Sequence, residues 1–215
     1  MRTAPSTDLT ASGVVAVLRA PSAAAYLPVV QTLIASGVTS VELTLTTPGT
    51  LDALPALVSA LPHTAEIGVG TVLTADHARA AIDGGARFLV TPAIKPDVIR
   101  VAVDAGIRVY PGAMTPTEVE AGWDLGATAV KVFPAQTLGP DYLRHLHGPF
   151  PHIPLLPSGG IDLAAIPSWI EAGAIAVSLG GPLLGAVFRD QDADALALRC
   201  RAALRAVSDA RGVRR

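Results

Sequence analysis

Short apolar runs alternate with longer alanine- and leucine-rich segments along the whole 215-residue chain. Eight runs have the composition of buried strands, at residues 14–18, 40–45, 66–70, 88–90, 107–110, 129–133, 154–156 and 174–179. The segments that follow them, or lie between them, have the composition of helices, at residues 23–35, 51–60, 75–83, 97–105, 116–125, 140–147, 163–172 and 183–208. Strands that alternate with helices predict a parallel sheet whose crossover helices cover its outer face.

Turn residues agree with this division. Several predicted helices end at a pair that contains glycine, at residues 36–37, 84–85, 105–106, 125–126 and 172–173, and glycine commonly follows a helix C-terminus. We therefore predict one domain over residues 1–215, a closed (β/α)8 or TIM barrel, with a lead-in at about residues 1–10 and a flexible tail at about 209–215. An open, doubly wound sheet is the alternative, which eight consecutive units disfavour.

Composition excludes several classes of function. The formal net charge of −2 is too balanced for a nucleic-acid or anionic-membrane partner. Cys200 is the only cysteine, so no intrachain disulfide can form. No stretch approaches the roughly 20 apolar residues that span a bilayer, and the first apolar run is too short for a signal sequence. We expect a soluble, cytoplasmic protein.

Lys131 lies within the apolar residues 129–135, where its neighbours are small, β-branched or aromatic. A lysine in a buried strand must lose its water or find a partner, and loss of water favours the neutral amine. A neutral amine is a nucleophile towards carbonyl carbon. The alternative is a lysine of an edge strand whose amine reaches solvent, and the apolar residues on both sides count against it.

Alternation along the strands predicts which side chains face the interior. Positions 41, 43 and 45 are apolar and should pack under helices, which leaves Glu42 inside. Arg19 and Thr71 fall at the carboxyl ends of the first and third strands, and Lys131 and Phe133 share one face of the sixth. Chemistry in barrels collects at the carboxyl ends, so these groups form the candidate site. The alternative is an ion pair of Glu42 with Lys131 or Arg19 that only supports the fold.

Two glycine-rich loops follow the seventh and eighth strands. They are Ser158-Gly159-Gly160 and Gly180-Gly181. Loops at these positions of a barrel commonly bind phosphate through free backbone N–H groups. The loops predict a phosphate subsite, although each pair could also serve only as a tight turn.

Histidines are absent from the predicted strand ends. The five are His63, His77, His145, His147 and His152, which map to helices, loops or the link into the seventh strand. A catalytic metal in this fold usually needs imidazoles or several carboxylates that converge. We expect neither a metal nor another cofactor.

Six segments resemble motifs of the KDPG aldolase family, in the same order and at similar spacing. They are VAVLR at 15–19, VELT at 41–44, IGVGTV at 67–72, PGAMTPTE at 111–118, VKVFP at 130–134 and PSGGI at 157–161. The resemblance spans about residues 13–184. The family comprises class I aldolases that act on 2-keto-3-deoxy-6-phosphogluconate or 4-hydroxy-2-oxoglutarate, and relatives act on the galactonate epimer.

The resemblance implies a Schiff-base lysine at Lys131 and a general acid/base at Glu42. It also implies that Thr71 and an arginine, here Arg19, hold the pyruvate carboxylate, and that barrels assemble as a homotrimer. The expected partners are a 2-keto acid such as pyruvate and an aldehyde. The implied reaction cleaves the phosphogluconate derivative to pyruvate and glyceraldehyde 3-phosphate, or 4-hydroxy-2-oxoglutarate to pyruvate and glyoxylate. Phe133 is expected to keep Lys131 dry.

The chain departs from the family pattern at three positions. Some members carry an arginine where this chain has Thr46, whereas Arg19 matches members with the arginine on strand one. Ser158 replaces a common threonine and keeps the hydroxyl. Gly181 replaces a common serine, which puts the strength of phosphate binding in question. Pro92, after the fourth strand, either shapes the pyruvyl pocket or only makes a rigid turn.

Two other functions stay open at this level. One is a phosphate-binding isomerase or epimerase that works with carboxylate bases and needs no imine lysine. The other is a non-catalytic barrel that binds a ligand. The presence together of Arg19, Glu42, Thr71 and Lys131 favours the aldolase over both.

Overall fold

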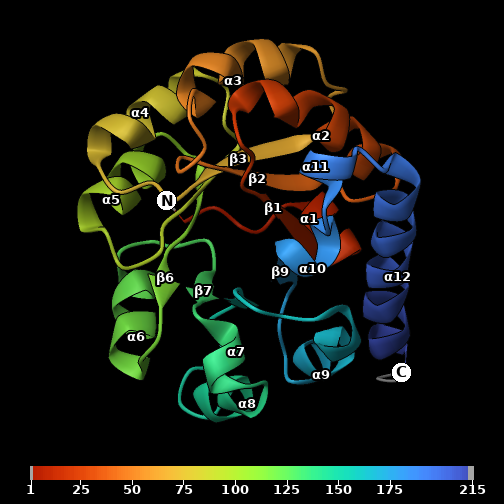
Figure 1. Cartoon of the computed structure of the whole chain (residues 1–215). Coiled ribbons are helices and arrows are strands. Elements are labelled where there is room, and N and C mark those ends of the chain that lie inside the picture. Colours follow the sequence, from red (N-terminus) through yellow and green to blue (C-terminus); the bar gives the residue numbers. More distant parts are fainter. Residues whose placement is uncertain (1, 213–215) are drawn as a thin grey trace.

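The computed structural model describes residues 2–212 as a curled sheet of parallel strands with helices on its outside (Figure 1). The strands are β1 (Val14–Leu18), β2 (Ser40–Thr44), β3 (Glu66–Gly70), β4 (Phe88–Val90), β5 (Arg108–Tyr110), β6 (Gly112–Ala113), β7 (Val130–Val132), β8 (Leu155–Pro157) and β9 (Val177–Leu179). Each of the eight predicted runs overlaps an observed strand. The α/β class with a parallel sheet is therefore confirmed.

The sheet has two hydrogen-bonded parts. The larger has the order β5-β4-β3-β2-β1-β9, and the smaller has the order β6-β7-β8. Only Pro111 separates β5 from β6 along the chain. On the other side, Ser158 after β8 forms an isolated parallel bridge with Ser178 of β9. The sheet thus curls into a half-barrel made of these two hydrogen-bonded parts.

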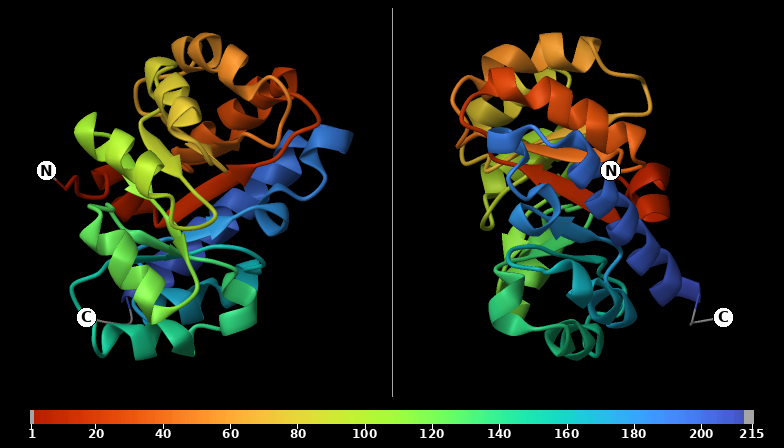
Figure 2. Two further views of the ribbon diagram at one scale, coloured as in Figure 1. Left: turned by 90° about the vertical axis from the view of Figure 1, so that its left-hand side faces the viewer. Right: turned by 45° about the vertical axis from the view of Figure 1, so that its right-hand side comes forward.

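Helices connect the strands and cover the outer face (Figures 1 and 2). They are α2 (Tyr26–Ala35), α3 (Thr50–Ser59), α4 (Ala75–Asp83), α5 (Pro96–Asp104), α6 (Pro116–Asp124), α8 (Asp141–His147), α9 (Ile166–Glu171) and α12 (Ala193–Gly212), with 3-10 turns η1 (Ala23–Ala25) and η2 (Leu163–Ala165) before α2 and α9. The long α12 runs along the outside and packs against α2 and α9.

The predicted helix at residues 183–208 was wrong in its extent. The chain instead forms α10 (Gly181–Leu184), α11 (Val187–Asp190) and α12. Gly185 (φ 57°) and Gln191 (φ 56°) adopt left-handed backbone between these helices, which a continuous helix does not allow. Residues 209–212, predicted as the start of a tail, continue α12. Residues 213–215 of that predicted tail lie outside the described residues.

Two further helices were not predicted. They are α1 (Thr7–Ser12), within and just past the predicted lead-in, and α7 (Ala135–Leu138), which directly follows the strand of Lys131. The Ser6 hydroxyl caps α1 by accepting the Leu9 amide at 3.1 Å. Both helices are too short to show a helical period in the sequence.

Along the strands, successive apolar side chains alternate between two clusters, one under the helices and one in the interior of the curled sheet. Those that face the helices, such as Val41 and Leu43, belong to the large cluster under the helices. Those that face the interior form a second cluster of Leu9, Val15, Phe88, Val90, Tyr110, Ala129, Leu156 and Ala176. Since Leu9 comes from α1, the N-terminal helix covers the amino-terminal end of the interior. The carboxyl-terminal end is left for the site.

A buried polar cluster lies at the amino-terminal end. The Glu66 carboxylate accepts hydrogen bonds from the Ser6 and Ser40 hydroxyls, both at 2.7 Å, and pairs with the Arg108 guanidinium at 3.4 Å. Glu66 is only 3% exposed. A buried carboxylate needs such partners, so this cluster fixes the N-terminal segment to β2, β3 and β5.

Over residues 2–212, none of the helices is both long enough and apolar enough to cross a membrane.

Candidate active site

Lys131 lies in the middle of β7 and points into the interior. It is 7% exposed, and its Nζ atom lies 5.1 Å from the centroid of the Phe133 ring. The ring and the amine are close enough for a cation–π contact. Within residues 2–212, Lys131 takes part in no ion pair. The amine is therefore held in a mostly apolar setting without a compensating carboxylate.

Glu42 lies on the interior face of β2, as the alternation predicts. It is 2% exposed. Its side chain lies across Gly70 of β3, so close that a Cβ atom at position 70 would collide with the carboxylate. Glycine at this position is what allows the carboxylate to lie there. Among the described residues, neither Lys131 nor Arg19 forms an ion pair with Glu42, which removes the purely structural ion pair as an explanation.

Arg19 follows β1 at the carboxyl end and is exposed. Its Nε atom donates to the Thr46 hydroxyl at 2.9 Å, and that hydroxyl lies 3.0 Å from the hydroxyl of Thr44. The guanidinium of Arg19 therefore reaches the position where some family members carry their arginine.

Thr71 follows β3 directly and is half-buried. Its φ is 60°, in the left-handed region. A β-branched residue rarely adopts this backbone conformation, and such strain is concentrated at functional sites. The next amide, of Val72, donates to the Val90 carbonyl at 3.1 Å, which ties this turn to β4. The sequence predicted the position of Thr71 but not its strained backbone.

Phe133 and Pro92 border the same end of the sheet. Phe133 is 36% exposed, so its ring covers Lys131 on one face and meets solvent on another. Its peptide bond to Pro134 is cis. Pro92 follows β4 and is half-buried, and a Cβ atom on Gly112 would collide with the Pro92 carbonyl. Pro92 thus packs tightly against the strand that precedes β7.

Both glycine-rich loops lie at the carboxyl ends of their strands. Gly159 (φ 96°) and Gly160 (φ 75°) adopt left-handed backbone, which explains the choice of glycine there. Gly180 precedes α10, and a Cβ on Gly181 would meet nothing within 4 Å. Among residues 2–212, the amides of Gly159, Gly160 and Gly180 donate to no protein acceptor. Ser158 is buried and its carbonyl accepts the Ala135 amide at 2.8 Å.

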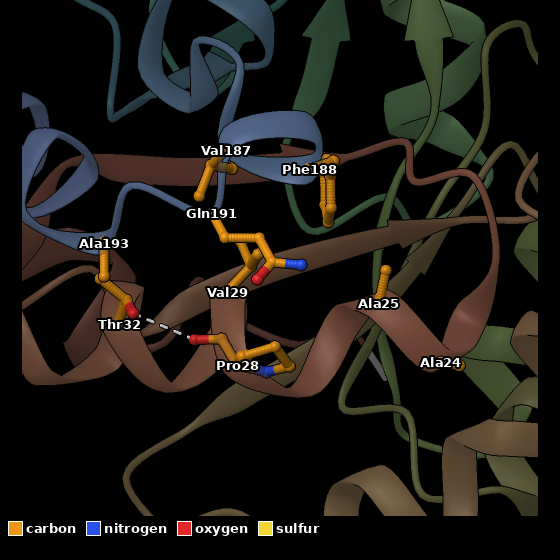
Figure 3. A pocket seen from close by; sticks show the side chains of 9 residues that line it. All are labelled: Ala24, Ala25, Pro28, Val29, Thr32, Val187, Phe188, Gln191 and Ala193. Atoms are coloured by element: carbon orange, nitrogen blue, oxygen red, sulfur yellow. Dashed lines mark hydrogen bonds between the residues drawn. The ribbon is translucent and has the colours of Figure 1, made fainter.

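One pocket elsewhere in the described chain lacks comparable chemistry. A pocket between α2 and α11 is lined mainly by small and apolar side chains, with Thr32 and Gln191 as its polar members (Figure 3). The Thr32 hydroxyl there donates to the Pro28 carbonyl at 3.0 Å. No ionisable side chain lines this pocket. Within residues 2–212, no group of three His, Cys, Asp or Glu side chains is placed to hold a metal ion.

The geometry therefore brings together, at one end of a curled parallel sheet, a buried lysine, a buried glutamate, an arginine and two glycine loops. A family model described as KDPG and KHG aldolase matches residues 6–198. The chain belongs to the KDPG and KHG aldolase family. It is accordingly a lyase of the aldolase type, and the resemblance of the six sequence segments is confirmed.

Curated and solved members of the KDPG and KHG aldolase family cover most of the chain. The chain is 36% identical to a 2-dehydro-3-deoxy-6-phosphogalactonate aldolase of Escherichia coli, over 79% of this chain and 83% of the relative. It is 32% identical to a 2-dehydro-3-deoxy-phosphogluconate aldolase of Haemophilus influenzae, over 74% and 78%. A solved KDPG aldolase from Legionella pneumophila, with pyruvate captured as a covalent carbinolamine, has a TM-score of 0.84 at 26% identity, over 94% and 98%.

Proposed function

We propose that this chain is a class I aldolase that cleaves 2-keto-3-deoxy-6-phosphogluconate to pyruvate and glyceraldehyde 3-phosphate through a Schiff base at Lys131. The observation that carries the proposal is that a basic and an acidic side chain, Lys131 and Glu42, are buried and face one interior without an ion pair between them. A buried pair held in this way favours chemistry over stability. The carbinolamine in the Legionella relative supports the same chemistry.

Lys131 is the nucleophile of the proposed mechanism. Its neutral amine attacks the C2 carbonyl of the 2-keto acid, and loss of water from the carbinolamine leaves an iminium ion. This cation accepts the electron pair of the C3–C4 bond when that bond breaks. The products of the step are an aldehyde and an enamine attached to Lys131. The apolar contact with Phe133 keeps water away from the amine.

Glu42 moves the protons. It accepts the proton of the C4 hydroxyl, through a water molecule, as the C3–C4 bond breaks, and it later returns a proton to C3 of the enamine. Hydrolysis of the resulting iminium ion then releases pyruvate and restores the amine. The position of the carboxylate across Gly70 directs it into the interior rather than towards solvent.

Arg19 and Thr71 are proposed to bind the pyruvyl carboxylate. A guanidinium offers a planar pair of donors for a carboxylate, and the Arg19 guanidinium is anchored by Thr46. The left-handed backbone of Thr71 gives its hydroxyl a geometry that an ordinary strand end does not provide. Pro92, which follows β4 at the same end of the sheet, is proposed to border this subsite.

The substrate phosphate is proposed to bind between Ser158, Gly159 and Gly160 on one side and Gly180 and Gly181 on the other. The free amides of these loops and the Ser158 hydroxyl are suitable donors for phosphate oxygens. The open space over Gly181 would accommodate an oxygen of the phosphate.

A second candidate substrate is the galactonate-derived epimer, which differs in configuration at C4. The 36% identity to an aldolase for that compound favours it. Cleavage of 4-hydroxy-2-oxoglutarate to pyruvate and glyoxylate is a further candidate, because the same pyruvyl subsite would serve it. All three share the chemistry at Lys131.

Closure of the sheet is also a proposal. Pro111 joins β5 to β6, and the Ser158–Ser178 bridge joins β8 to β9, which supports a complete (β/α)8 barrel. A homotrimer and a cytoplasmic location stay predictions from the resemblance and the composition.

A substrate panel tests the proposed function. The purified chain is given each of the three compounds, and release of pyruvate is followed with lactate dehydrogenase and NADH. We expect turnover of at least one phosphorylated epimer, with kcat/KM at least 10-fold above that for 4-hydroxy-2-oxoglutarate. A folded protein that releases no pyruvate from any of them would contradict the proposal. The ratio between the two epimers identifies the physiological configuration.

A further inference from the structure

The Ser178 hydroxyl is buried without a partner. Ser178 is 3% exposed, lies in β9 and forms the isolated bridge with Ser158. Its Oγ atom has no hydrogen-bond partner, and within residues 2–212 only Tyr110 and His147 share this condition. A buried hydroxyl without a partner is costly. Such an atom usually indicates a water or a ligand that completes its hydrogen bonds.

The strand register places Ser178 level with Glu42. Val15 of β1 pairs with Ser178 on one side and with Ser40 on the other. Because the strands of a barrel tilt, paired residues on neighbouring strands differ in height by about one residue rise. Along the barrel axis towards the carboxyl ends of the strands, Ser178 therefore lies one residue rise above Val15, and Ser40 lies one residue rise below it. Glu42, two residues beyond Ser40, is at the height of Ser178.

The same argument from the other side places Ser178 level with Lys131. Leu156 of β8 pairs with Lys131, and the Ser158–Ser178 bridge aligns Leu156 with Ala176. Lys131 lies one residue rise above Leu156 along the barrel axis, and Ala176 lies one residue rise below Leu156. Ser178, two residues beyond Ala176, is at the height of Lys131. Glu42, Lys131 and Ser178 thus belong to one layer of inward side chains, with β9 between their strands.

The next layer of inward side chains, towards the amino-terminal end, consists of Val15, Leu156, Gly68 and Tyr110. Three of these four residues offer no side-chain hydrogen-bond partner to the layer of Ser178. Val15 and Leu156 are apolar, and Gly68 has its space filled by the Phe88 ring. The fourth is Tyr110, whose pKa is raised by burial and by nearby Glu66, so its phenol stays protonated. A water in the Ser178 layer would have the Glu42 carboxylate, the Lys131 amine and the Ser178 hydroxyl as three partners, which is the number that a buried water typically has.

We propose that Ser178 is a positioning residue that holds the water through which Glu42 transfers protons. The inference rests on the proposed aldolase chemistry. In cleavage, the water accepts the C4 hydroxyl proton and passes one of its own to the Glu42 carboxylate. In the return step, protonated Glu42 gives a proton to the water, and the water gives one to C3 of the enamine. The Ser178 hydroxyl keeps the water aligned and is unchanged by either step.

Proton transfer and imine formation can be measured separately with pyruvate alone. Exchange of the pyruvate methyl hydrogens in D2O, followed by NMR, reports proton transfer at C3. Borohydride trapping at saturation, followed by intact mass, reports the imine at Lys131. For Ser178→Ala we expect full trapping but exchange that is about 10- to 100-fold slower, less than the complete loss of general acid–base catalysis. Ser178→Thr keeps the hydroxyl and should recover much of the exchange.

Ser40→Ala is the matched control. It removes a hydroxyl from the same interior, but at the amino-terminal end, where that hydroxyl donates to Glu66. Its exchange per folded molecule should equal that of the unaltered chain. Ser178→Ala with exchange within 2-fold of the unaltered chain would overturn the proposal, and so would a loss of trapping that parallels the loss of exchange. Absence of trapping in the unaltered chain would instead refute the aldolase function and, with it, this role of Ser178.

Discussion

At the scale of single residues, the reactivity proposed for this site depends on ionisable side chains that are buried without an ion-pair partner. Lys131 and Glu42 are buried at 7% and 2% exposure, and neither forms an ion pair among the described residues. The contrast is Glu66, which is as buried but has two serine donors and an arginine. Glu66 is stabilised by its partners, whereas Glu42 has no such ion pair and is the group proposed above to move protons.

Gly70→Ala tests whether the position of Glu42 matters. The new Cβ atom would collide with the carboxylate and displace it. We expect kcat/KM to fall by about 10²-fold, the lower range for loss of general acid–base catalysis, at a cost of about 1–3 kcal/mol in stability from overpacking. Steady-state kinetics and urea unfolding measure both effects.

Gly148→Ala is the control for this substitution, because Gly148 has ordinary negative φ and lies exposed after α8. It should leave kcat/KM unchanged. Activity of Gly70→Ala equal to that of this control would show that Glu42 can act from elsewhere.

The residues predicted from the sequence were those with a chemical contrast to their neighbours. Lys131 and Glu42 are charged groups within apolar runs, so alternation alone indicated their direction. Ser178 was missed because position 176 of the same face is alanine, and a serine beside a small residue gives no contrast. The φ of Thr71 was missed because nothing in a threonine side chain indicates a left-handed backbone.

Among the elements, α6 has the most complete capping. Thr115 is its N-cap, and Glu118 completes a capping box by accepting the Thr115 amide at 2.8 Å. The Glu118 carboxylate also accepts the Met114 amide at 2.8 Å. These hydrogen bonds, with the Met114 amide as the largest contribution, lower the pKa of Glu118 below 4.5.

Thr115→Ala should destabilise the fold by about 1 kcal/mol, the usual cost of losing an N-cap. Because the folded pKa of Glu118 is depressed, its contribution is complete above pH 4.5 and is lost as the pH falls from there through the folded pKa. The difference between the variant and the unaltered chain should therefore shrink below pH 4.5. Urea unfolding at pH 7 and at several acidic values measures it.

Thr117→Ala serves as the matched control, since Thr117 is an exposed threonine of the same helical turn. It should change stability by no more than about 0.5 kcal/mol. An equal effect of the two substitutions, or a Thr115→Ala effect independent of pH, would contradict the capping account.

Element boundaries were predictable where hydrophobic runs end at turn residues. Runs such as 14–18, 66–70 and 88–90 match β1, β3 and β4 without change. The C-terminal region failed because alanine and leucine continue through residues 183–208, while the backbone breaks at Gly185 and Gln191. A composition that favours helix does not reveal where tertiary packing turns the chain.

At the scale of the whole molecule, the two ends of the interior differ in the side chains that they hold. The amino-terminal end is closed by Leu9 of α1 and by the Glu66 cluster. The Arg211 guanidinium of α12 adds to this closure by donating to the carbonyls of Thr10 and Ile175, at 2.8 and 2.9 Å. These contacts lie at the amino-terminal end, and the proposed catalytic groups lie towards the opposite end.

Ser40→Ala should therefore cost stability, although it lies in the same interior as the site. Its loss leaves Glu66 without one of its donors, which costs about 1–3 kcal/mol for a buried group. Urea unfolding measures the change. Ser59→Ala, at an exposed hydroxyl that bonds only to the Pro55 carbonyl, is the control. A Ser40 effect no larger than that of Ser59 would show that the Glu66 cluster is not a structural anchor.

The parallel α/β architecture was predictable from the repeated strand and helix composition, whereas the division of the sheet into two hydrogen-bonded parts was not. The contact between β8 and β9 depends on a single bridge at Ser158 and Ser178, two serines with no distinctive pattern. Helix α1, which covers the amino-terminal end of the interior, was also not predicted, because Leu9 is its only buried residue.

The most direct test of the central claim is reductive trapping with pyruvate. The unaltered chain and Lys131→Ala are each incubated with pyruvate and borohydride, and intact mass and peptide mapping follow. We predict one reduced pyruvyl adduct, located on Lys131, and none on the folded variant. No adduct on the folded, unaltered chain, or an adduct located only on Lys95, would contradict the Schiff-base mechanism.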